Sequence, residues 1–238
     1  MPAVSIALWG AVFADHEARR TRERAWRREH VVTTLEADGV CSAALAESVW
    51  RAALQRFHLS WTEQHHTPGV AWCLGEGLAA HGLRPGTAFD ELVADLETRA
   101  LDDLPPLLPG AREGLQQLAE RWPLGLLCDV QITPAPILRE CLERHGILAL
   151  FDATVFSDEV GASKPLVTGF RVLAEEGGWL LSELVHVGPD LTRDVAGAHA
   201  AGATAVRLGP ATDQADACAE DLLGSIAAIE EATDATAS

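Results

Sequence analysis

The chain has 238 residues, of which 48% are hydrophobic, and its formal net charge is −17. This composition is typical of a globular protein with one large core or two smaller ones, and the acidic balance excludes a sequence-independent nucleic-acid binder, because phosphate affinity needs clustered lysine and arginine. We expect no membrane association and no signal peptide, because no run approaches the roughly twenty apolar residues of a membrane span and the start lacks a basic and apolar leader.

The five cysteines show neither paired nor metal-site spacing. Because we expect neither a signal peptide nor a membrane span, we expect a cytoplasmic protein. In such a protein the odd number of cysteines favours reduced thiols.

The amino-terminal half begins with an apolar strand within Val4 to Phe13, followed by a long helical region. Helix-forming runs cover residues 43–54, 71–81 and 88–100, and the turn signals Asp38-Gly39, Thr67-Pro68-Gly69 and Arg84-Pro85-Gly86 separate them. We therefore expect residues 15–104 to form a helical cap domain inserted into a core domain made of residues 1–14 and 105–238.

Two segments of this helical region carry polar side chains of interest. Residues 19–28 are the one locally basic run, which we interpret as a solvated helix face; the alternative is a positive lid over an anionic ligand. His65 and His66 follow the end of a helix, and we expect them at the surface or in a lid. His65 stays a candidate for ligand binding.

The carboxy-terminal half alternates helices with short apolar strands. We expect helices over residues 112–121, 136–145 and 171–176, strands over 124–129, 154–156 and 185–188, a loop over 157–161, and a last helix over 219–231 with a frayed end from residue 232. This alternation predicts a Rossmann-like α/β fold, a parallel sheet with helices on both faces.

Five polar side chains follow the ends of the expected strands. Because ligands of parallel sheets bind beyond the carboxyl ends of the strands, these side chains should converge on one crevice, where we also expect an exposed thiol. The candidates for catalysis are Cys128, Asp129, Lys164, Asp190 and Asp194. The candidates for ligand binding are Trp9, His65, Cys128, Asp129, Lys164 and Asp190.

The segments Asp152-Ala153, Ser163-Lys164-Pro165, His186-Val187-Gly188 and 194–202 resemble motifs of the haloacid dehalogenase (HAD) superfamily, and the resemblance covers nearly the whole chain. It implies a helical cap that closes over the crevice and selects a small-molecule substrate. In this family an Asp at the end of the first strand attacks the substrate, a Ser or Thr ends the second, a Lys steadies the charge, and paired acids hold magnesium.

The sequence departs from this pattern at the positions that carry the chemistry. Ala7 stands in the place of the nucleophile, Trp9 in that of the acid/base, and Pro189 in that of the first metal-binding Asp. A methyl group cannot attack and an indole cannot ligate magnesium. The aromatic residue at position 9 resembles the dehalogenase-like branch of the superfamily, which keeps only the first Asp of this motif.

Other family positions are partly kept. Gly10 matches and Ala11 does not, and Cys128 replaces the Ser or Thr. Lys164 and Asp194 remain, and Asp190 lies one position after the lost acid.

From these losses we expect a protein without phosphatase activity that binds a small molecule or a partner in or over the crevice. One alternative is a metal-independent cyclase, isomerase, lyase or transferase using the five candidates and His65; another is a weak hydrolase that uses displaced acids. We expect no cofactor, and we do not expect the crevice to bind magnesium. A protein partner and a homo-oligomer both remain open.

Overall fold

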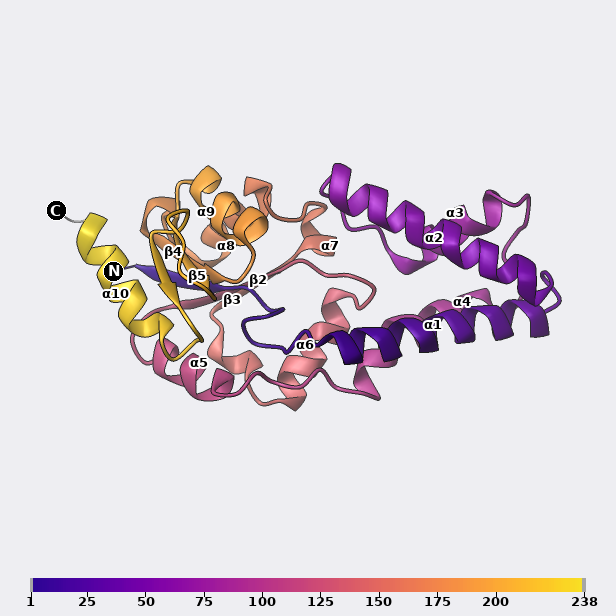
Figure 1. Ribbon diagram of the computed structural model, residues 1–238, viewed down its shortest axis with the longest axis horizontal. Coiled ribbons are helices and arrows are strands. Elements are labelled where there is room, and N and C mark those ends of the chain that lie inside the picture. Colours follow the sequence, from indigo (N-terminus) through magenta and orange to yellow (C-terminus); the bar gives the residue numbers. More distant parts are fainter. Residues whose placement is uncertain (1, 237–238) are drawn as a thin grey trace. The chain divides into compact units, whose positions relative to one another are not determined.

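The computed structural model describes residues 2–236, which form a six-stranded sheet and a set of helices (Figure 1). By contacts between Cα atoms the chain forms two compact units: one contains residues 1–14, 105–129 and 139–238, and the other contains residues 15–104 and 130–138. We refer to them as the sheet unit and the helical unit.

The sheet unit contains one parallel sheet in the order β3-β2-β1-β4-β5-β6. Its strands are β1 (Ala3–Ile6), β2 (Leu124–Cys128), β3 (Ala153–Phe156), β4 (Leu184–Gly188), β5 (Thr204–Leu208) and β6 (Ala217–Ala219). The strand order reverses at β1, which lies between β2 and β4, and such a switch point is where open α/β sheets bind ligands. The predicted Rossmann-like fold class is confirmed.

The central strands are apolar because helices cover both of their faces. The sheet-unit helices are α5 (Ala111–Ala119), α6 (Ala135–Arg144, which crosses the boundary between the units), α7 (Ser157–Val160), α8 (Val167–Gly177), α9 (Ala196–Ala201) and α10 (Ser225–Thr236). Figure 1 shows α8 and α9 on one side of the sheet and α5 and α10 on the other. Phe170 and Leu173 of α8 pack on Leu127 and Val155 in a dry core.

The helical unit has a core of its own. Its helices are α1 (Glu17–Ala37), α2 (Ala43–Glu63), α3 (Val70–Ala79) and α4 (Phe89–Thr98), followed by the 3₁₀ turn η1 (Arg99–Leu101). Val31 and Leu35 of α1, Trp50 of α2 and Leu74 of α3 are buried together with Leu96 of α4. The buried residues recur every three or four positions along a helix, as Val31 and Leu35 do on α1, and so form apolar stripes that face this core.

Several local expectations are wrong. We expected no strand over residues 204–208 or 217–219, which form β5 and β6, and residues 157–160 form α7 instead of the expected loop. The last helix covers residues 225–236, so it starts later than expected and continues past residue 232; residues 237 and 238 lie outside the described part of the chain. No helix between residues 2 and 236 is both long and apolar enough to cross a membrane.

Candidate active site

The end of β1 carries the first group of predicted site residues. Ala7 follows the strand, is buried, and donates its N–H to the carbonyl of Val187 at 2.9 Å. Gly10 has a φ of +76°, and a Cβ there would lie 3.0 Å from Cγ of Pro189. The loops after β1 and β4 therefore meet through an apolar contact, and neither Ala7 nor Pro189 offers an oxygen from its side chain.

Trp9 and Ala11 lie in the same loop. Ala11 is buried, and the half-buried Trp9 ring meets Phe13 edge to face with centroids 5.7 Å apart. The buried indole Nε1 has no hydrogen-bond partner within the described residues. Trp9 is thus a packing residue whose one donor stays unused.

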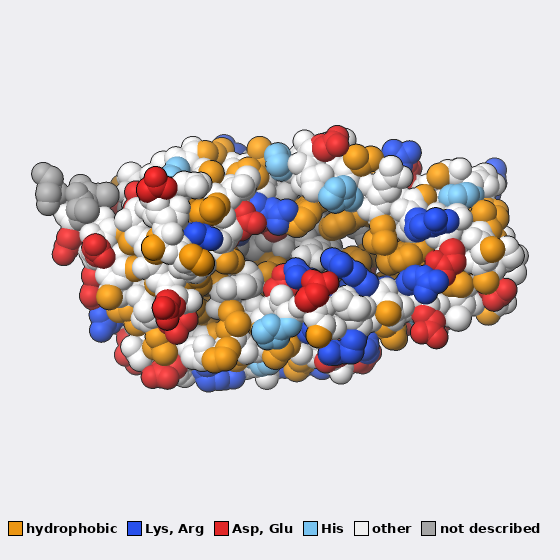
Figure 2. Space-filling view, viewed as in Figure 1, with side chains coloured by type: hydrophobic (Ala, Val, Ile, Leu, Met, Phe, Trp, Pro, Cys, Tyr) orange, Lys and Arg blue, Asp and Glu red, His pale blue; other side chains and the backbone are white. Residues whose placement is uncertain are grey.

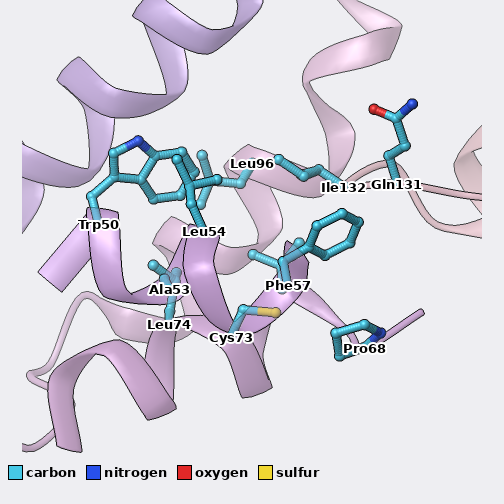
Figure 3. A pocket seen from close by; sticks show the side chains of 11 residues that line it. Trp50, Ala53, Leu54, Phe57, Pro68, Cys73, Leu74, Leu96, Gln131 and Ile132 are labelled. Atoms are coloured by element: carbon cyan, nitrogen blue, oxygen red, sulfur yellow. The ribbon is translucent and has the colours of Figure 1, made fainter. Parts of the chain in front are cut away.

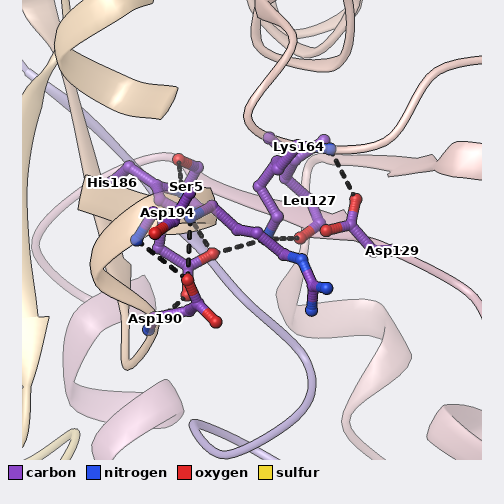
Figure 4. Close-up of polar contacts among 9 residues, drawn as sticks. Ser5, Leu127, Asp129, Lys164, His186, Asp190 and Asp194 are labelled. Atoms are coloured by element: carbon purple, nitrogen blue, oxygen red, sulfur yellow. Dashed lines mark hydrogen bonds and ion pairs between the residues drawn. The ribbon is translucent and has the colours of Figure 1, made fainter. Parts of the chain in front are cut away.

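A buried ion pair forms the centre of the site. Lys164 Nζ lies 2.6 Å from Oδ1 of Asp194, and both side chains are 5% exposed (Figure 4). The same ammonium donates to the carbonyl of Leu127 at 3.1 Å. An ammonium has three N–H groups, so the third N–H of Lys164 has no hydrogen-bond partner among the described residues.

The pair holds both groups in their charged forms. Burial alone would lower the pKa of Lys164, but the carboxylates of Asp194 and Asp129 outweigh it and raise that pKa. Burial would raise the pKa of Asp194, and the charge of Lys164 together with the hydrogen bond from His186 holds it well below its usual range instead.

Two residues that the sequence analysis did not single out complete this network. Ser5 and His186 are register partners on β1 and β4, and Ser5 Oγ lies 2.8 Å from Nδ1 of His186. The other ring nitrogen, Nε2, lies 3.2 Å from Oδ1 of Asp194. Burial lowers the pKa of His186, so the ring is neutral and donates through Nε2 to the Asp194 carboxylate. The signal in the sequence was polar residues inside apolar strands, Val-Ser-Ile and Val-His-Val.

Asp129 lies beside Lys164 at the carboxyl end of β2. Its Oδ1 accepts the backbone N–H of Lys164 at 2.9 Å, and its side chain is half-buried. Burial raises the pKa of Asp129, although the positive charge of Lys164 opposes the rise. Asp129 is therefore a carboxylate whose proton affinity is higher than usual, which suits a general base.

Cys128 does not have the exposure that we expected. It is 1% exposed, and burial, followed by the charge of Asp129, raises the pKa of its thiol well above the usual value. A strand end at the crevice edge did not leave the thiol in solvent, so the expectation of an exposed Cys128 is wrong. Such a thiol is a poor nucleophile.

Asp190 is exposed and has a local role. Its side chain accepts the N–H groups of Thr192 at 2.9 Å and Arg193 at 2.8 Å, and its own N–H donates to Oδ2 of Asp194 at 2.9 Å. The ion pair of Lys164 is formed with Asp194, as Figure 4 shows, and Asp190 orders the turn that carries Asp194.

The residues present do not fit a magnesium ion. Magnesium needs near-octahedral oxygen ligands, and the side chains of Ala7, Trp9 and Pro189 supply none. Both oxygens of Asp194 already accept hydrogen bonds, from Lys164, His186 and the N–H of Asp190. Across residues 2–236, no group of three His, Cys, Asp or Glu side chains is arranged to hold a metal.

His65 belongs to the helical unit and has a φ of +50°, in the left-handed region. The same unit contains a cavity of about 20 Å³ lined by apolar side chains, among them Trp50, Phe57 and Ile132 (Figure 3). That volume holds about one water molecule, so the cavity does not accommodate a metabolite.

The surface carries no large basic face in the view of Figure 2, where acidic and basic side chains are interspersed.

A parallel six-stranded sheet with a buried Lys–Asp pair at its carboxyl edge, in a chain that also forms a helical unit, defines an α/β protein of the Rossmann-like class. The chain belongs to the haloacid dehalogenase-like hydrolase family, whose model matches residues 14–202. The match starts after residues 7–13, the segment in which the sequence departs from the family's first motif.

Two curated relatives resemble part of the chain. Ribulose-1,5-bisphosphate 5-phosphatase of Halopiger xanaduensis is 33% identical over 143 residues, which is 58% of each chain. 5-Amino-6-(5-phospho-D-ribitylamino)uracil phosphatase YigB of Escherichia coli is 29% identical over 137 residues, 58% of this chain and 52% of that protein. The chain thus spans little more than half the length of these relatives.

Among solved structures, 2-haloacid dehalogenase of Pseudomonas syringae pv. Tomato has a TM-score of 0.70, with 97% of this chain and 98% of that chain covered. The two chains are 17% identical, so the likeness shows the fold.

The expectation of a protein without phosphatase activity is wrong in the light of these findings. The chain belongs to a hydrolase family, and both curated relatives are named phosphatases. Ala7 and Pro189 remove the family's nucleophile and its first metal-binding acid, but these two substitutions do not show that hydrolysis is absent.

Proposed function

We propose that the protein is a hydrolase that cleaves the phosphate monoester of a small phosphorylated sugar or polyol. The observation that carries the proposal is the Lys164 ammonium, which Asp194 and the Leu127 carbonyl hold at the carboxyl edge of the sheet beside Asp129. Its remaining N–H group is placed to bind a phosphate oxygen, and its charge compensates the negative charge of the reacting group.

Water is the nucleophile in this proposal, because Ala7 cannot attack. As the water oxygen bonds to phosphorus, its proton passes to the carboxylate of Asp129, and the ester P–O bond breaks. The leaving alkoxide takes a proton from solvent, and the products are inorganic phosphate and an alcohol. Burial supports this role, since it raises the pKa of Asp129 and so makes the carboxylate a stronger base.

We further propose that this reaction needs no magnesium ion. The charge that a metal would compensate falls to Lys164 here, and Asp194 serves to hold the lysine and not to ligate an ion. Without a metal or a side-chain nucleophile, turnover is expected to be slow, because each contributes several powers of ten in enzymes that use them.

The substrate class rests on the relatives. Both printed names describe phosphatases that act on a 5-phosphate, one of ribulose bisphosphate and one of a ribityl compound. A phosphorylated five-carbon sugar or polyol is therefore our proposed substrate. Cys41, Cys73, Cys128 and Cys218 form no disulfide bond in the structure, which supports the proposal of a reducing, cytoplasmic location.

Phosphate release from a panel of pentose and pentitol 5-phosphates tests the proposal. We expect slow turnover that a metal chelator leaves unchanged and that Asp129→Asn and Lys164→Gln each reduce about a hundredfold or more. Asp213→Asn, a change at an exposed loop carboxylate, is the matched control. Acid quenching with ³²P-labelled substrate should leave no label on the protein. Absence of release from the whole panel, or turnover insensitive to Asp129→Asn, would refute the proposal.

A further inference from the structure

The first half of α1 carries charged side chains on its buried face. Arg19, Glu23 and Arg27 are spaced four residues apart, and Val31 and Leu35 continue the same stripe into the core of the helical unit. Glu23 is 4% exposed, and the side chain of Arg27 is 14% exposed. The interpretation of residues 19–28 as a solvated helix face therefore fails for this stripe, and the buried charges need an explanation.

The contacts within this cluster are loose. Glu23 lies 3.7 Å from Arg27 and 3.6 Å from Arg99 of η1, distances at which no hydrogen bond forms. Arg99 is fixed above the ring of Trp26 at 4.7 Å, and Arg19 donates to the carbonyl of Asp103 at 2.7 Å. The guanidinium groups are thus held in place without having their hydrogen bonds completed.

Four buried polar atoms of the cluster have no hydrogen-bond partner in the part of the chain that the structure describes. They are Nε of Arg19, Nε of Arg27, Nε of Arg99 and Oε2 of Glu23. Folded proteins leave few such atoms unpaired, because each costs about 1–3 kcal/mol, and a concentration of them in one place points to a bound ion or ligand.

The net positive charge of the cluster also points to a bound anion. Arg27 and Arg99 lie within 3.7 Å of the Glu23 carboxylate, and Arg19 follows on the same stripe of α1. Three positive charges therefore share one buried negative charge, which leaves two of them uncompensated within this set. The further contact of Arg99, 3.6 Å from Asp102, is with a carboxylate that is 75% exposed and therefore screened by solvent. Burial lowers the pKa of Arg27, and the neighbouring Arg19 and Arg99 lower it further against the opposing charge of Glu23.

We propose that Arg19, Arg27 and Arg99 form a binding site for the phosphate group of a polyhydroxylated ligand. Arginine suits this role because its planar fork of donors matches phosphate oxygens. The unpaired Oε2 of Glu23 accepts a hydrogen bond from a hydroxyl of the same ligand. All four side chains belong to the helical unit, and none takes part in the proposed hydrolysis, so the inference does not depend on that function.

Titration of the full chain with inorganic phosphate, followed by NMR of the arginine Nε–H groups, tests the site directly. We expect saturable shifts of the Nε–H signals of Arg19, Arg27 and Arg99, and no equivalent shifts with chloride at equal ionic strength. Arg27→Gln should weaken phosphate binding about tenfold or more. Arg24→Gln removes the same charge from an exposed position of α1 and should change the affinity less than about twofold.

A second variant acts in the opposite direction. Glu23→Gln removes the one buried negative charge, so inorganic phosphate should bind more tightly, whereas a pentitol 5-phosphate should lose the advantage that it has over phosphate in the parent. Equal affinity of parent and Glu23→Gln for phosphate, or chloride shifts as large as those of phosphate, would overturn the proposal. The phosphate affinity of Glu23→Gln tests the site even if Arg27→Gln fails to fold. A loss of hydrolysis in Asp129→Asn would not bear on phosphate binding at this site.

Discussion

The ammonium of Lys164 lies 2.6 Å from the carboxylate of Asp194, and both groups are withdrawn from solvent. The pair joins the loop after α7 to the turn after β4, so it both stabilises the fold and concentrates charge at the carboxyl edge of the sheet.

Removing the negative partner of this pair should be costly. Asp194→Asn leaves a buried ammonium without its counter-charge and is expected to reduce the free energy of unfolding by about 3–5 kcal/mol in chemical denaturation. The double variant Lys164→Met with Asp194→Leu should lose less than Asp194→Asn alone, because no unpaired charge remains. A loss for Asp194→Asn as small as that of Asp213→Asn would contradict the account.

The same stabilisation should depend on pH in one direction. The pKa of Asp194 is lowered in the folded chain, so its contribution is complete above the unfolded pKa, about 3.9, and is lost as pH falls through the folded value. The stability difference between parent and Asp194→Asn should therefore be constant from about pH 5 to 8 and shrink in stronger acid.

The pH dependence of turnover should report Asp129. Hydrolysis requires its ionised form, and burial raises its pKa, so the acidic limb of the rate profile should lie above the pKa of an ordinary Asp, about 3.9. Steady-state rates across a series of acidic buffers measure this limb. An acidic limb at the ordinary value, or the same limb in Asp129→Asn, would remove Asp129 from the role of base.

Cys128 should resist thiol reagents in the native protein. The thiol is buried and its pKa is raised, whereas Cys41 and Cys218 are half-buried and should react first. Peptide mass spectrometry after brief labelling, with and without denaturant, distinguishes them. Native labelling of Cys128 as fast as that of Cys218 would show that solvent reaches the end of β2.

Gly188 should not tolerate a side chain. A Cβ at this position would lie 2.4 Å from Cγ of Asp194, so Gly188→Ala must displace the carboxylate from Lys164. We expect a loss of about 2–4 kcal/mol in unfolding free energy, in the range of overpacking combined with a damaged ion pair. Gly75→Ala on α3 meets no atom within 4 Å and should be neutral or stabilise by up to about 1 kcal/mol.

Restoring the family's acids should create magnesium affinity. Ala7→Asp, Trp9→Asp and Pro189→Asp together add three carboxylates to an edge that lacks side-chain oxygens, and titration calorimetry should detect tighter magnesium binding than in the parent. Circular dichroism checks that the triple variant is folded. Equal and negligible affinity in a folded triple variant would refute our explanation of the missing ligands.

The sequence predicted the parts of the fold where burial leaves a strong pattern. Residues 124–128 and 184–188 lie inside the sheet, are buried throughout and are apolar except for His186, so their strands were recognisable. Residues 217–219 form a three-residue edge strand that is only half-buried, and an edge strand of that length leaves no periodic signal. α7 was missed because a four-residue helix adds little to a loop pattern.

The sequence predicted which residues follow the strand ends, but it did not predict which of their side chains contact one another. Strand order placed Lys164 and Asp194 at one edge, but the sequence left open whether Lys164 pairs with Asp190 or Asp194. The burial of Cys128 and the hydrogen bond between Ser5 and His186 depend on neighbours that are distant in the sequence. Such contacts depend on strand register and on side-chain packing, and the local sequence pattern around each residue does not show either.

The register of Ser5 against His186 fixes the direction of the hydrogen bonds inside the sheet. Because Asp194 is anionic, the proton between it and His186 resides on Nε2, and the bare Nδ1 accepts from Ser5. The three groups form a chain of dipoles with a single orientation in the buried interior of the sheet unit. None of them takes up a proton in the proposed hydrolysis, so a slower turnover in heavy water should report the proton transfer from water to Asp129 and not the hydrogen bonds of the strands beneath it.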